Sequence, residues 1–590
     1  MHSNNKLFFR RYLLIAYVLP VALIMWFVTN FNVNIPFWDE WSLVSFFDKF
    51  ASDNAKFGDF FAQNNEHRLF FPKIIFIILA FTSSWDTTRE MYFSIFLVIV
   101  SFCAIYRIAS DNPNQDKILF HLFNITTCLL LFSLVQWENW LWGFQLAWFF
   151  INTCVILSIF FLVVPKKLLP ILRLSISAIL CFIASFSSAH GLFSWISLVP
   201  TVASVEGSNR QKKVRLLVWI LLFVLSLFIY QIGYIKPSNH PDIFFFFKKP
   251  LIAITYLLTL LGSSIGKVFI PVAILGFIIT FSFVLFNIYY LKNYKSDFAR
   301  NATPWLSLGW FTTLFALLTT LGRAGFGVEQ AKSSRYTSVT VLLVIALLQI
   351  LRLLIYYKLN CKIRNIYKRS LCIFVIIFLI WVSNSDQEIG RGRGTWIERT
   401  SGKTCFEIIH FIDPSLRQQP NNCLDSISPR EFQLIETSEI LQRIGFRNFP
   451  RDIAFTEKTI KNYGYIDSPT KKDKPLIVDN NEDIRFSGWV VLPDGKEQPQ
   501  LVLLSYNDKK SFFANAVVKV KKPVVAQLLN SSDYQKSRWS VDVSLSSIPV
   551  GESVIKAWVY DPNHKQFVKL NNEIKIKKVH QLATKAIAAY

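Results

Sequence analysis

The stretch LLIAYVLPVALIMWFV, residues 13–28, decides the class of this protein. It carries no charge, and Arg10 and Arg11 precede it. Further apolar segments follow at roughly 70–85, 91–108, 118–135, 144–164, 168–186, 191–204, 214–233, 268–291, 303–321, 336–357 and 369–384. A helix needs about 20 predominantly apolar residues to cross the hydrocarbon core of a bilayer. The sequence therefore predicts a polytopic α-helical membrane protein.

The composition also indicates a membrane protein, and the positions of the charges indicate which partners to expect. The chain of 590 residues is 52% hydrophobic and 16% aromatic, and only 17% of its residues are charged. A formal net charge of +24 would suggest nucleic acid in a soluble protein, but here much of the basic excess lies in short loops between apolar segments. That distribution is typical of cytoplasmic loops, so we expect membrane lipids as partners and no nucleic acid. The basic loops are 166–167, 210–215, 292–300 and 358–369.

The same charges predict how the segments cross. With the basic loops inside, everything after residue 385 falls outside, together with the loops 136–144, 187–191, 234–266 and 322–336. Arg10 and Arg11 place the N-terminus inside, so one of the three segments between the first outer loop and the loop 136–144 must fail to cross. The segment 70–85 is short and contains Pro72 and Lys73. It therefore predicts an interfacial or re-entrant helix, and about 11 crossings remain.

The composition changes after residue 385. Gly390–Thr400 is basic and contains glycines, which is typical of a linker, and residues 403–470 mix helical periods with turns. Residues 474–578 alternate apolar and polar residues with a period of two, and about seven such short strands predict a β-sandwich. The predicted domains are a transmembrane domain at 1–384, an extracytoplasmic linker region of mixed structure at 385–472, and a β-sandwich at 473–580.

Two cysteines give a second indication of which side the tail faces. Cys405 and Cys423 lie in the polar region after the last apolar segment, whereas the other six cysteines lie in or beside apolar segments. A cysteine pair isolated in one soluble region predicts a disulfide and therefore an oxidising compartment. No Cys/His cluster has the spacing of a zinc site.

Two short motifs flank the first predicted outer loop. Pro36-Phe37-Trp38-Asp39-Glu40-Trp41 follows the first apolar helix, and Asn65-Glu66-His67-Arg68 comes just before the next apolar segment. Carboxylates held at a membrane surface by tryptophans are costly to desolvate and are usually functional. The layout of residues 1–384 resembles the GT-C glycosyltransferases, integral membrane enzymes that take a sugar from a polyprenyl-phosphate carrier. The resemblance implies a catalytic base in this loop, Asp39 in preference to its neighbour Glu40.

Further residues of the predicted outer loops complete the candidate site. A planar guanidinium can bind a phosphate in a bidentate manner, a histidine can carry a proton, and three tryptophans within 136–145 can stack on a sugar. The resemblance also implies a basic residue of a late outer loop at the lipid phosphate, which favours Arg335 and then Arg323. Glu138 is a second acidic candidate if Asp39 is structural. The predicted substrate-binding residues are Glu66, His67, Arg68, Glu138, Gln145, His190, Arg323, Arg335 and Tyr336.

Each pattern also has a structural explanation. Trp38 and Trp41 suit interfacial anchors around solvated carboxylates, and the tryptophans of 136–145 suit an aromatic belt. The arginines suit snorkelling side chains at a membrane surface. In the predicted sandwich, three tryptophans would stack on a glycan if exposed, or fill the core if strand alternation turns them inward: Trp489, Trp539 and Trp558.

Sequence and resemblance together predict an inverting GT-C glycosyltransferase of a bacterial inner membrane. It would move a sugar from a polyprenyl-phosphate donor to a glycan or lipid-linked acceptor on the outer face. The chain has no P-loop, dinucleotide motif or DxD pair, which favours a lipid-linked donor over a sugar nucleotide. Two other classes stay open, namely a flippase or transporter of lipid-linked glycans and a non-catalytic scaffold for polysaccharide assembly. The need for a divalent metal ion also stays open.

Overall fold

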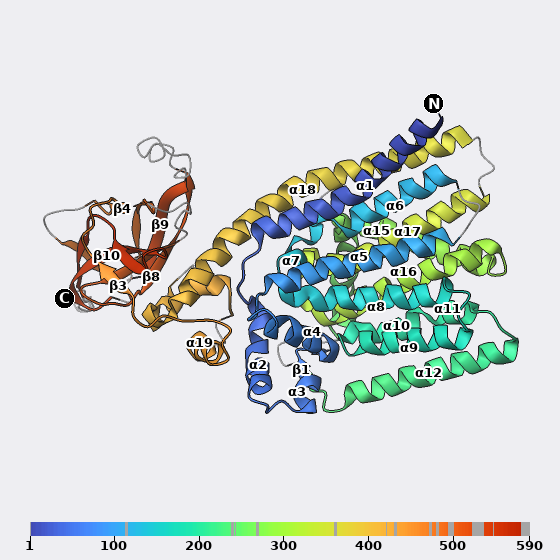
Figure 1. The fold of residues 1–590 in the computed structure, drawn as a ribbon, viewed down its shortest axis with the longest axis horizontal. Helices are drawn as coiled ribbons and strands as arrows, with labels where there is room; N and C mark the ends of the chain where they lie inside the picture. The colour runs from blue at the N-terminus through green and yellow to red at the C-terminus, as the bar shows by residue number, and fades with distance from the viewer. Residues whose placement is uncertain are drawn as a thin grey trace, which may run out of the picture. The chain divides into compact units, whose positions relative to one another are not determined.

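The computed structural model divides into two compact units (Figure 1). Unit 1 comprises Met1–Asn32 and Ala55–Gly392, and unit 2 comprises Val33–Asn54 and Arg393–Tyr590. Unit 1 is almost entirely helical, and unit 2 contains the long strands. The structure describes residues 2–111, 116–237, 241, 244–266, 271–358, 363–419, 422–429, 433–470, 475–479, 483–493, 501–521, 536–544, 546 and 548–579.

Nine helices of the described residues are long and apolar enough to cross a membrane. The candidate spans are Arg11–Phe31, Thr88–Ser110, Lys117–Trp140, Gly143–Val163, Asn209–Gln231, Val272–Lys292, Asp297–Phe326, Ser334–Tyr357 and Tyr367–Glu407. The main helices within them are α1 (His2–Phe31), α5 (Thr88–Ser110), α6 (Lys117–Leu131), α8 (Leu146–Val163), α12 (Asn209–Gln231), α15 (Val272–Lys292), α16 (Asp297–Arg323), α17 (Thr337–Lys358) and α18 (Ile363–Glu407). Shorter apolar helices are α4 (Phe70–Phe81), α9 (Pro170–Ser185) and α14 (Pro250–Gly262). The chain is thus a polytopic helical membrane protein with a β-rich C-terminal region, and the number of crossings stays a prediction.

Short polar side chains cap the N-termini of several of these helices. Asp116 accepts a hydrogen bond from the backbone of Leu119 at the start of α6, at 3.0 Å. Ser208 and Ser296 accept equivalent bonds at the starts of α12 and α16, at 3.3 and 3.2 Å. Such caps satisfy backbone N–H groups that the first helical turn leaves without partners. Ser208 precedes the basic loop 210–215 and Ser296 lies in the basic loop 292–300, so these loops also fix where α12 and α16 start.

The loops of unit 1 gather at two opposite ends of the helices. At one end, Lys166 after α8 binds Asp111 after α5, with Nζ 2.6 Å from Oδ2. Tyr367 near the start of α18 donates a hydrogen bond to Asp116, which precedes α6. We call this the basic end, because the loops 166–167 and 358–369 meet the α5–α6 connection there.

The loops predicted to lie outside gather at the other end, which we call the Glu66 end. Glu66 binds Arg323 at the end of α16, with Oε1 2.7 Å from Nη2. Asn139 donates to the backbone carbonyl of Arg335 at 3.1 Å. The grouping agrees with the one predicted from the charges, because α16 and α17 run between the two ends. Which face of the membrane is outward stays a prediction.

The short helix α4 does not connect the two ends. It starts just after Arg68 at the Glu66 end, and its 12 residues span roughly 18 Å, less than the hydrocarbon core of about 30 Å. Because α5 ends beside the basic end, its first turn lies at the Glu66 end, where Trp85 after α4 donates to Glu90 at 3.1 Å. Both ends of α4 therefore lie at the Glu66 end, which supports the predicted interfacial or re-entrant role of 70–85.

Two helical segments differ from the prediction. The segment 191–204 is interrupted: α10 (Phe193–Ser197) and α11 (Val199–Ser204) meet at Leu198, with Pro200 in the first turn of α11. Conversely, the predicted linker Gly390–Thr400 is continuous helix within α18. A Cβ atom on Gly392 would come within 2.6 Å of the ring of Phe27 on α1. At Gly392, at least, the glycine thus permits close helix packing and does not break the helix.

Unit 2 joins two distant parts of the chain. The first part contains the 3₁₀ turn η1 (Trp38–Ser42) and α2 (Leu43–Ala51), and α2 packs on α19 (Leu434–Arg443). Asp48 binds Arg443 at 2.8 Å, and the indole N–H of Trp41 donates to the carbonyl of Ile427 at 2.9 Å. These contacts hold the predicted catalytic loop on the C-terminal region.

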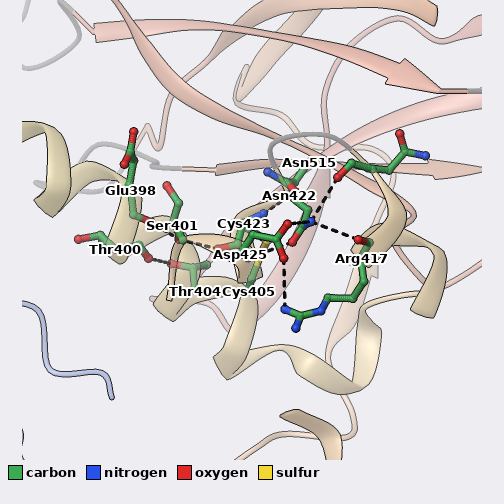
Figure 2. Close-up of a disulfide and its surroundings, with 12 residues drawn as sticks. Glu398, Thr400, Ser401, Thr404, Cys405, Arg417, Asn422, Cys423, Asp425 and Asn515 are labelled. Atoms are coloured by element: carbon green, nitrogen blue, oxygen red, sulfur yellow. Dashed lines mark hydrogen bonds and ion pairs between the residues drawn. A yellow bond between two sulfur atoms is a disulfide. The ribbon is translucent and has the colours of Figure 1, made fainter. Parts of the chain in front are cut away.

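The predicted disulfide between Cys405 and Cys423 is present. Figure 2 shows its surroundings, where Asn422 donates to Asp425 at 2.7 Å. The backbone N–H of Cys423 donates to the side chain of Asn515, a residue of the β-sheet, at 2.9 Å. The disulfide therefore ties the end of α18 to the segment that contacts the sheet.

Among the described residues of unit 2, ten strands form one hydrogen-bonded sheet, where about seven were predicted. They are β3 (Ala454–Thr456), β4 (Gly464–Ser468), β5 (Leu476–Asp479), β6 (Asp483–Val490), β7 (Leu501–Tyr506), β8 (Ala514–Lys521), β9 (Lys536–Ser544), β10 (Gly551–Asp561), β11 (Gln566–Lys569) and β12 (Ile574–Val579). The order is β3-β11-β10-β7-β8-β9-β6-β4, and β12 pairs with β10 and β5. The first half of β8 pairs with β7 and the second half with β9, so β8 passes between two layers that share one apolar core.

The tryptophans of the sheet follow the alternation of their strands. Trp539 is fully buried and Trp558 is 3% exposed, so both belong to the interior as strand alternation indicates. Trp489 is half-buried, beside the exposed Tyr465 on the neighbouring strand. Of the three, only Trp489 has part of its surface outside the interior.

Candidate functional site

A cavity of about 410 Å³ lies at the Glu66 end of unit 1. Five of the predicted substrate-binding residues line it, and they come from four separate parts of the chain. Side chains that the sequence analysis did not select line it as well, among them two aromatic residues, a threonine and a lysine. The lining residues used below are Glu66, His67, Trp148, His190, Tyr234, Lys236, Thr319, Arg323 and Tyr336.

A small β-hairpin presents Glu66 and His67 to this cavity. Strands β1 (Gln63–Asn64) and β2 (His67–Arg68) pair antiparallel, and Asn65 in the turn has φ of 48°. Asparagine tolerates this left-handed conformation better than most residues, which suits a two-residue hairpin turn. The hydroxyl of Tyr230 on α12 donates to the carbonyl of Glu66 at 2.6 Å. The hairpin is thereby fixed to the end of α12.

A guanidinium and an imidazole surround the carboxylate of Glu66. Oε1 lies 2.7 Å from Nη2 of Arg323 and 3.6 Å from Nε2 of His67. Burial by itself would raise the pKa of Glu66, but His67 and Arg323 outweigh it and lower the pKa to about 2. Glu66 is therefore an anion at physiological pH and a weak proton acceptor.

A hydrogen-bonded chain links the two histidines of the cavity. The backbone N–H of Ala189 donates to Nδ1 of His67 at 3.5 Å, so Nδ1 is an acceptor and the ring proton of the neutral form lies on Nε2, toward Glu66. The Ser188 hydroxyl lies 3.2 Å from that Nδ1 and 3.1 Å from Nδ1 of His190. Burial, and then the charge of His67, lower the pKa of His190 to about 3, which keeps its ring neutral.

Aromatic rings also line the cavity, beside the two histidines. The ring of Trp148 lies 5.2 Å from that of His190 and 5.5 Å from that of Phe315. Phe315 in turn lies 6.4 Å from Tyr336, which lines the cavity. The cavity therefore combines charged groups with apolar ring faces, an arrangement typical of small-molecule sites.

Three other predicted substrate-binding residues do not line the cavity, namely Arg335, Glu138 and Gln145. Arg335 forms a loose ion pair with Glu138, with Nε 3.8 Å from Oε1, and lies over the ring of Trp142. Ser334 donates to the other oxygen of Glu138 at 3.0 Å. Gln145 is buried, and its Oε1 has no partner within the described residues. The Glu138–Arg335 pair joins the loops 136–145 and 322–336.

Arg68 has a structural environment. Its guanidinium is buried, donates to the carbonyls of Phe61 and Ile232 at 2.9 and 2.5 Å, and lies over the ring of Phe61. Burial lowers the pKa of Arg68. These contacts favour a role in holding the hairpin on the loop after α12 over the predicted contact with a phosphate.

The two predicted catalytic carboxylates lie in unit 2. Asp39 is half-buried in η1, and its carbonyl accepts a hydrogen bond from Ser42 at 2.6 Å. Glu40 is 1% exposed, and its Oε2 accepts from the backbone N–H of Phe37 at 3.0 Å. Glu40 thus caps the turn, which leaves Asp39 as the more accessible of the two carboxylates.

Five residues of the site were missed in the sequence. Trp148 and Thr319 lie inside apolar helices, where their residue types carry no distinguishing pattern. Ser188, Tyr234 and Lys236 lie in loops that were predicted to be outside, and their polar side chains were the available signal. Within the described part of the chain, no three His, Cys, Asp or Glu side chains come together as metal ligands, so we assign no metal ion.

No family model matches this chain, and no curated protein or solved structure matches it significantly. The candidate site therefore rests on its own geometry.

Proposed function

We propose that the protein is a membrane glycosyltransferase that takes a sugar from a polyprenyl-phosphate donor. The observation that carries the proposal is the convergence of Glu66, His67, His190 and Arg323 on one cavity at one end of membrane-spanning helices. The volume of the cavity falls within the range of about 300–1,000 Å³ that small-molecule sites usually have. An opening near a membrane surface suits a substrate with a polar headgroup and a lipid tail.

The charges of the cavity suit a phosphodiester. Arg323 and Lys236 are cations, and Glu66 neutralises one of them, so a single positive charge remains when both histidines are neutral. A sugar joined to a lipid monophosphate carries a single negative charge on its phosphodiester. Trp148 and Tyr336 offer ring faces on which the sugar can pack.

In the proposed reaction, Arg323 and Lys236 stabilise the lipid phosphate as it leaves. Asp39 is the proposed base, which deprotonates or orients the acceptor hydroxyl; this assignment rests on the GT-C resemblance. The acceptor is a glycan or a lipid-linked glycan on the outer face of a bacterial inner membrane.

The test uses the full-length protein in lipid nanodiscs and a panel of polyprenyl-phosphate monosaccharides. Release of polyprenyl phosphate is measured, because this product is the same for every donor sugar. Arg323→Gln should slow the release by roughly 100-fold, and Asp39→Asn should do the same or more. The matched control is Arg300→Gln at the other end of α16, where the side chain is 74% exposed.

Two outcomes would contradict the proposal. The wild-type protein could release no polyprenyl phosphate from any donor with any glycan acceptor tried. Alternatively, Arg323→Gln and Arg300→Gln could turn over donor at the same rate. Transport of an intact lipid-linked glycan without release of phosphate would instead favour a flippase.

A further inference from the structure

A second cavity lies at the end of unit 1 that is remote from Glu66. It is an open groove of about 460 Å³ between the start of α9 and the start of α12. One wall is apolar and the other is polar and basic. The apolar residues are Leu169, Pro170, Ile171, Leu174 and Val214, and the polar residues are Glu206, Arg210, Gln211 and Arg215.

The polar wall carries a positive charge that no described residue neutralises. Glu206 is the single acidic residue among the described lining residues, and Arg173 already pairs with it at 3.0 Å. Arg215 is held in place, since its Nη2 donates to the carbonyl of Glu206 at 2.9 Å and its Nε to that of Gln211 at 3.2 Å. Its Nη1 is buried without a partner in the part of the chain that the structure describes.

Arg210 is exposed and also forms no hydrogen bond or ion pair with any described residue. Two guanidinium groups therefore line the same groove. Backbone carbonyls hold that of Arg215, whereas that of Arg210 is free to move. Guanidinium groups bind phosphate oxygens through paired hydrogen bonds. An anionic group is the ligand that this wall recognises.

The apolar wall continues onto a surface that suits lipid chains. Leu169, Ile171 and Val214 are 69%, 67% and 52% exposed. Further along α12, Leu217 and Leu221 are both 58% exposed. Exposed apolar side chains in such a row on a membrane-spanning helix are covered by lipid tails. A molecule in the groove can thus contact arginines with one part and the lipid phase with another.

The groove lies at the membrane surface opposite the Glu66 cavity. Arg210 and Arg215 are in the first two turns of α12, whereas Tyr230, which binds the Glu66 hairpin, is in its last turn. The 23 residues of α12 span roughly 35 Å, about the thickness of the hydrocarbon core. A ligand of the groove therefore does not take part in chemistry at the cavity, and this inference is independent of the proposed function.

We infer that the groove binds an anionic glycerophospholipid of the surrounding bilayer. Its phosphate is held by Arg210 and Arg215, and an acyl chain packs on Leu169, Ile171 and Val214. Basic pockets between membrane helices bind the headgroups of anionic lipids in this way. The bound lipid fills the space between α9 and α12 at the basic end.

The test is native mass spectrometry of the purified full-length protein with phosphatidylglycerol or phosphatidylcholine of identical acyl chains. The wild-type protein should retain phosphatidylglycerol in preference. Arg210→Gln should lower that retention by about fivefold, and the double variant with Arg215→Gln should lower it further. Arg300→Gln, an exposed arginine that does not line the groove, is the control and should retain lipid like the wild type.

Several results would overturn the inference. Equal retention by Arg210→Gln and Arg300→Gln, or equal retention of the two lipids, would remove the phosphate contact. Displacement of the lipid by millimolar glycerol phosphate would indicate a site for a free phosphate ester, and tighter retention of polyprenyl phosphate would indicate a carrier-lipid site. If the double variant does not fold, the single variant decides, because Arg210 forms no contact that the described fold needs.

Discussion

The stability of the folded protein depends on pH through the buried ring of His190, which lines the cavity. Its pKa is lowered from 6.5 to about 3 by burial and by the nearby charge of His67. The unfolded chain binds a proton there below about pH 6.5, while the folded protein does not. Stability that is present above pH 6.5 is therefore lost as the pH falls toward 3.

This difference predicts a pH-dependent melting temperature. Between pH 6.5 and pH 5, the wild-type protein should lose about 2 kcal/mol of unfolding free energy through His190. His190→Asn should lose measurably less over the same interval. The control His564→Asn removes a histidine outside the cavity, which contacts Asp561 at 2.8 Å, and should keep the wild-type change in melting temperature over this pH interval. Identical pH profiles for wild type and His190→Asn would show that the ring titrates normally.

A second prediction at this scale separates the two roles considered for Arg68. Because its guanidinium satisfies buried carbonyls, Arg68→Ala should lower the unfolding free energy by about 1.5–3 kcal/mol. The readout is the melting temperature in detergent, with the exposed Arg89→Ala as control. A variant that melts like the wild type but loses affinity for a polyprenyl-phosphate donor would restore the predicted phosphate contact.

The hairpin explains why the sequence placed Glu66 and His67 at the cavity correctly but did not do so for Arg68. Glu66, His67, His190 and Arg323 were recognised because charged residues in loops on one side of a membrane protein tend to converge. Arg68 was grouped with them, but successive residues of a strand point to opposite faces. His67 therefore faces the cavity while Arg68 faces the loop after α12, and no sequence signal gave the strand.

At the scale of elements, glycines set the distance between α14 and α15. A Cβ atom on Gly276 would collide with the carbonyl of Leu258, and one on Gly262 with that of Val272. Both neighbouring atoms belong to the backbone, so side-chain movement cannot relieve the clash. The two helices therefore pack backbone against backbone.

Gly276→Ala should therefore lower the unfolding free energy of unit 1 by about 1–3 kcal/mol. Gly390→Ala in α18 is the matched control, since nothing lies within 4 Å of the added atom and alanine favours a helix by about 0.5–1 kcal/mol. The measurement is the fraction of folded protein that survives heating, by size-exclusion chromatography. Equal losses in both variants would contradict the close packing.

Close helix packing at a glycine also explains why the prediction of a linker at 390–400 was wrong. Glycines in a polar, basic stretch are typical of a loop when only local sequence is considered. In the fold, Gly392 lies against Phe27 and the helix continues to Glu407. The contact joins residues far apart in the chain, so local sequence could not reveal it.

At the scale of the whole molecule, the disulfide predicts the behaviour of unit 2 under reduction. Cys405 and Cys423 are 18 residues apart, and closing a loop of that size contributes about 3 kcal/mol in the chain-entropy model. Reduction should destabilise unit 2 by that amount. Alkylation followed by mass spectrometry should modify both cysteines only after reductant is added. Modification without reductant would contradict the bond and the oxidising compartment predicted for the tail.

The organisation of unit 2 was only partly predictable. Strand alternation after residue 474 indicated the β-region, because period-two patterns are local. The membership of Val33–Asn54 was not predictable, because a short stretch between apolar helices gives no sign of its distant partner. Its contacts are specific, as Trp41 packs on Phe406 with ring centroids 4.9 Å apart and Phe47 on Phe446 at 5.9 Å.

This division of unit 2 has a consequence for biosynthesis. Val33–Asn54 leaves the ribosome roughly 340 residues before Arg393, where the rest of its unit begins. At about 5–20 residues per second, the delay is roughly 17–70 s. During that interval, the membrane helices are inserted while Phe46 and Phe47 await the partners that later bury them. Nascent chains halted before residue 393 would therefore carry this segment in a form that proteases and chaperones can recognise.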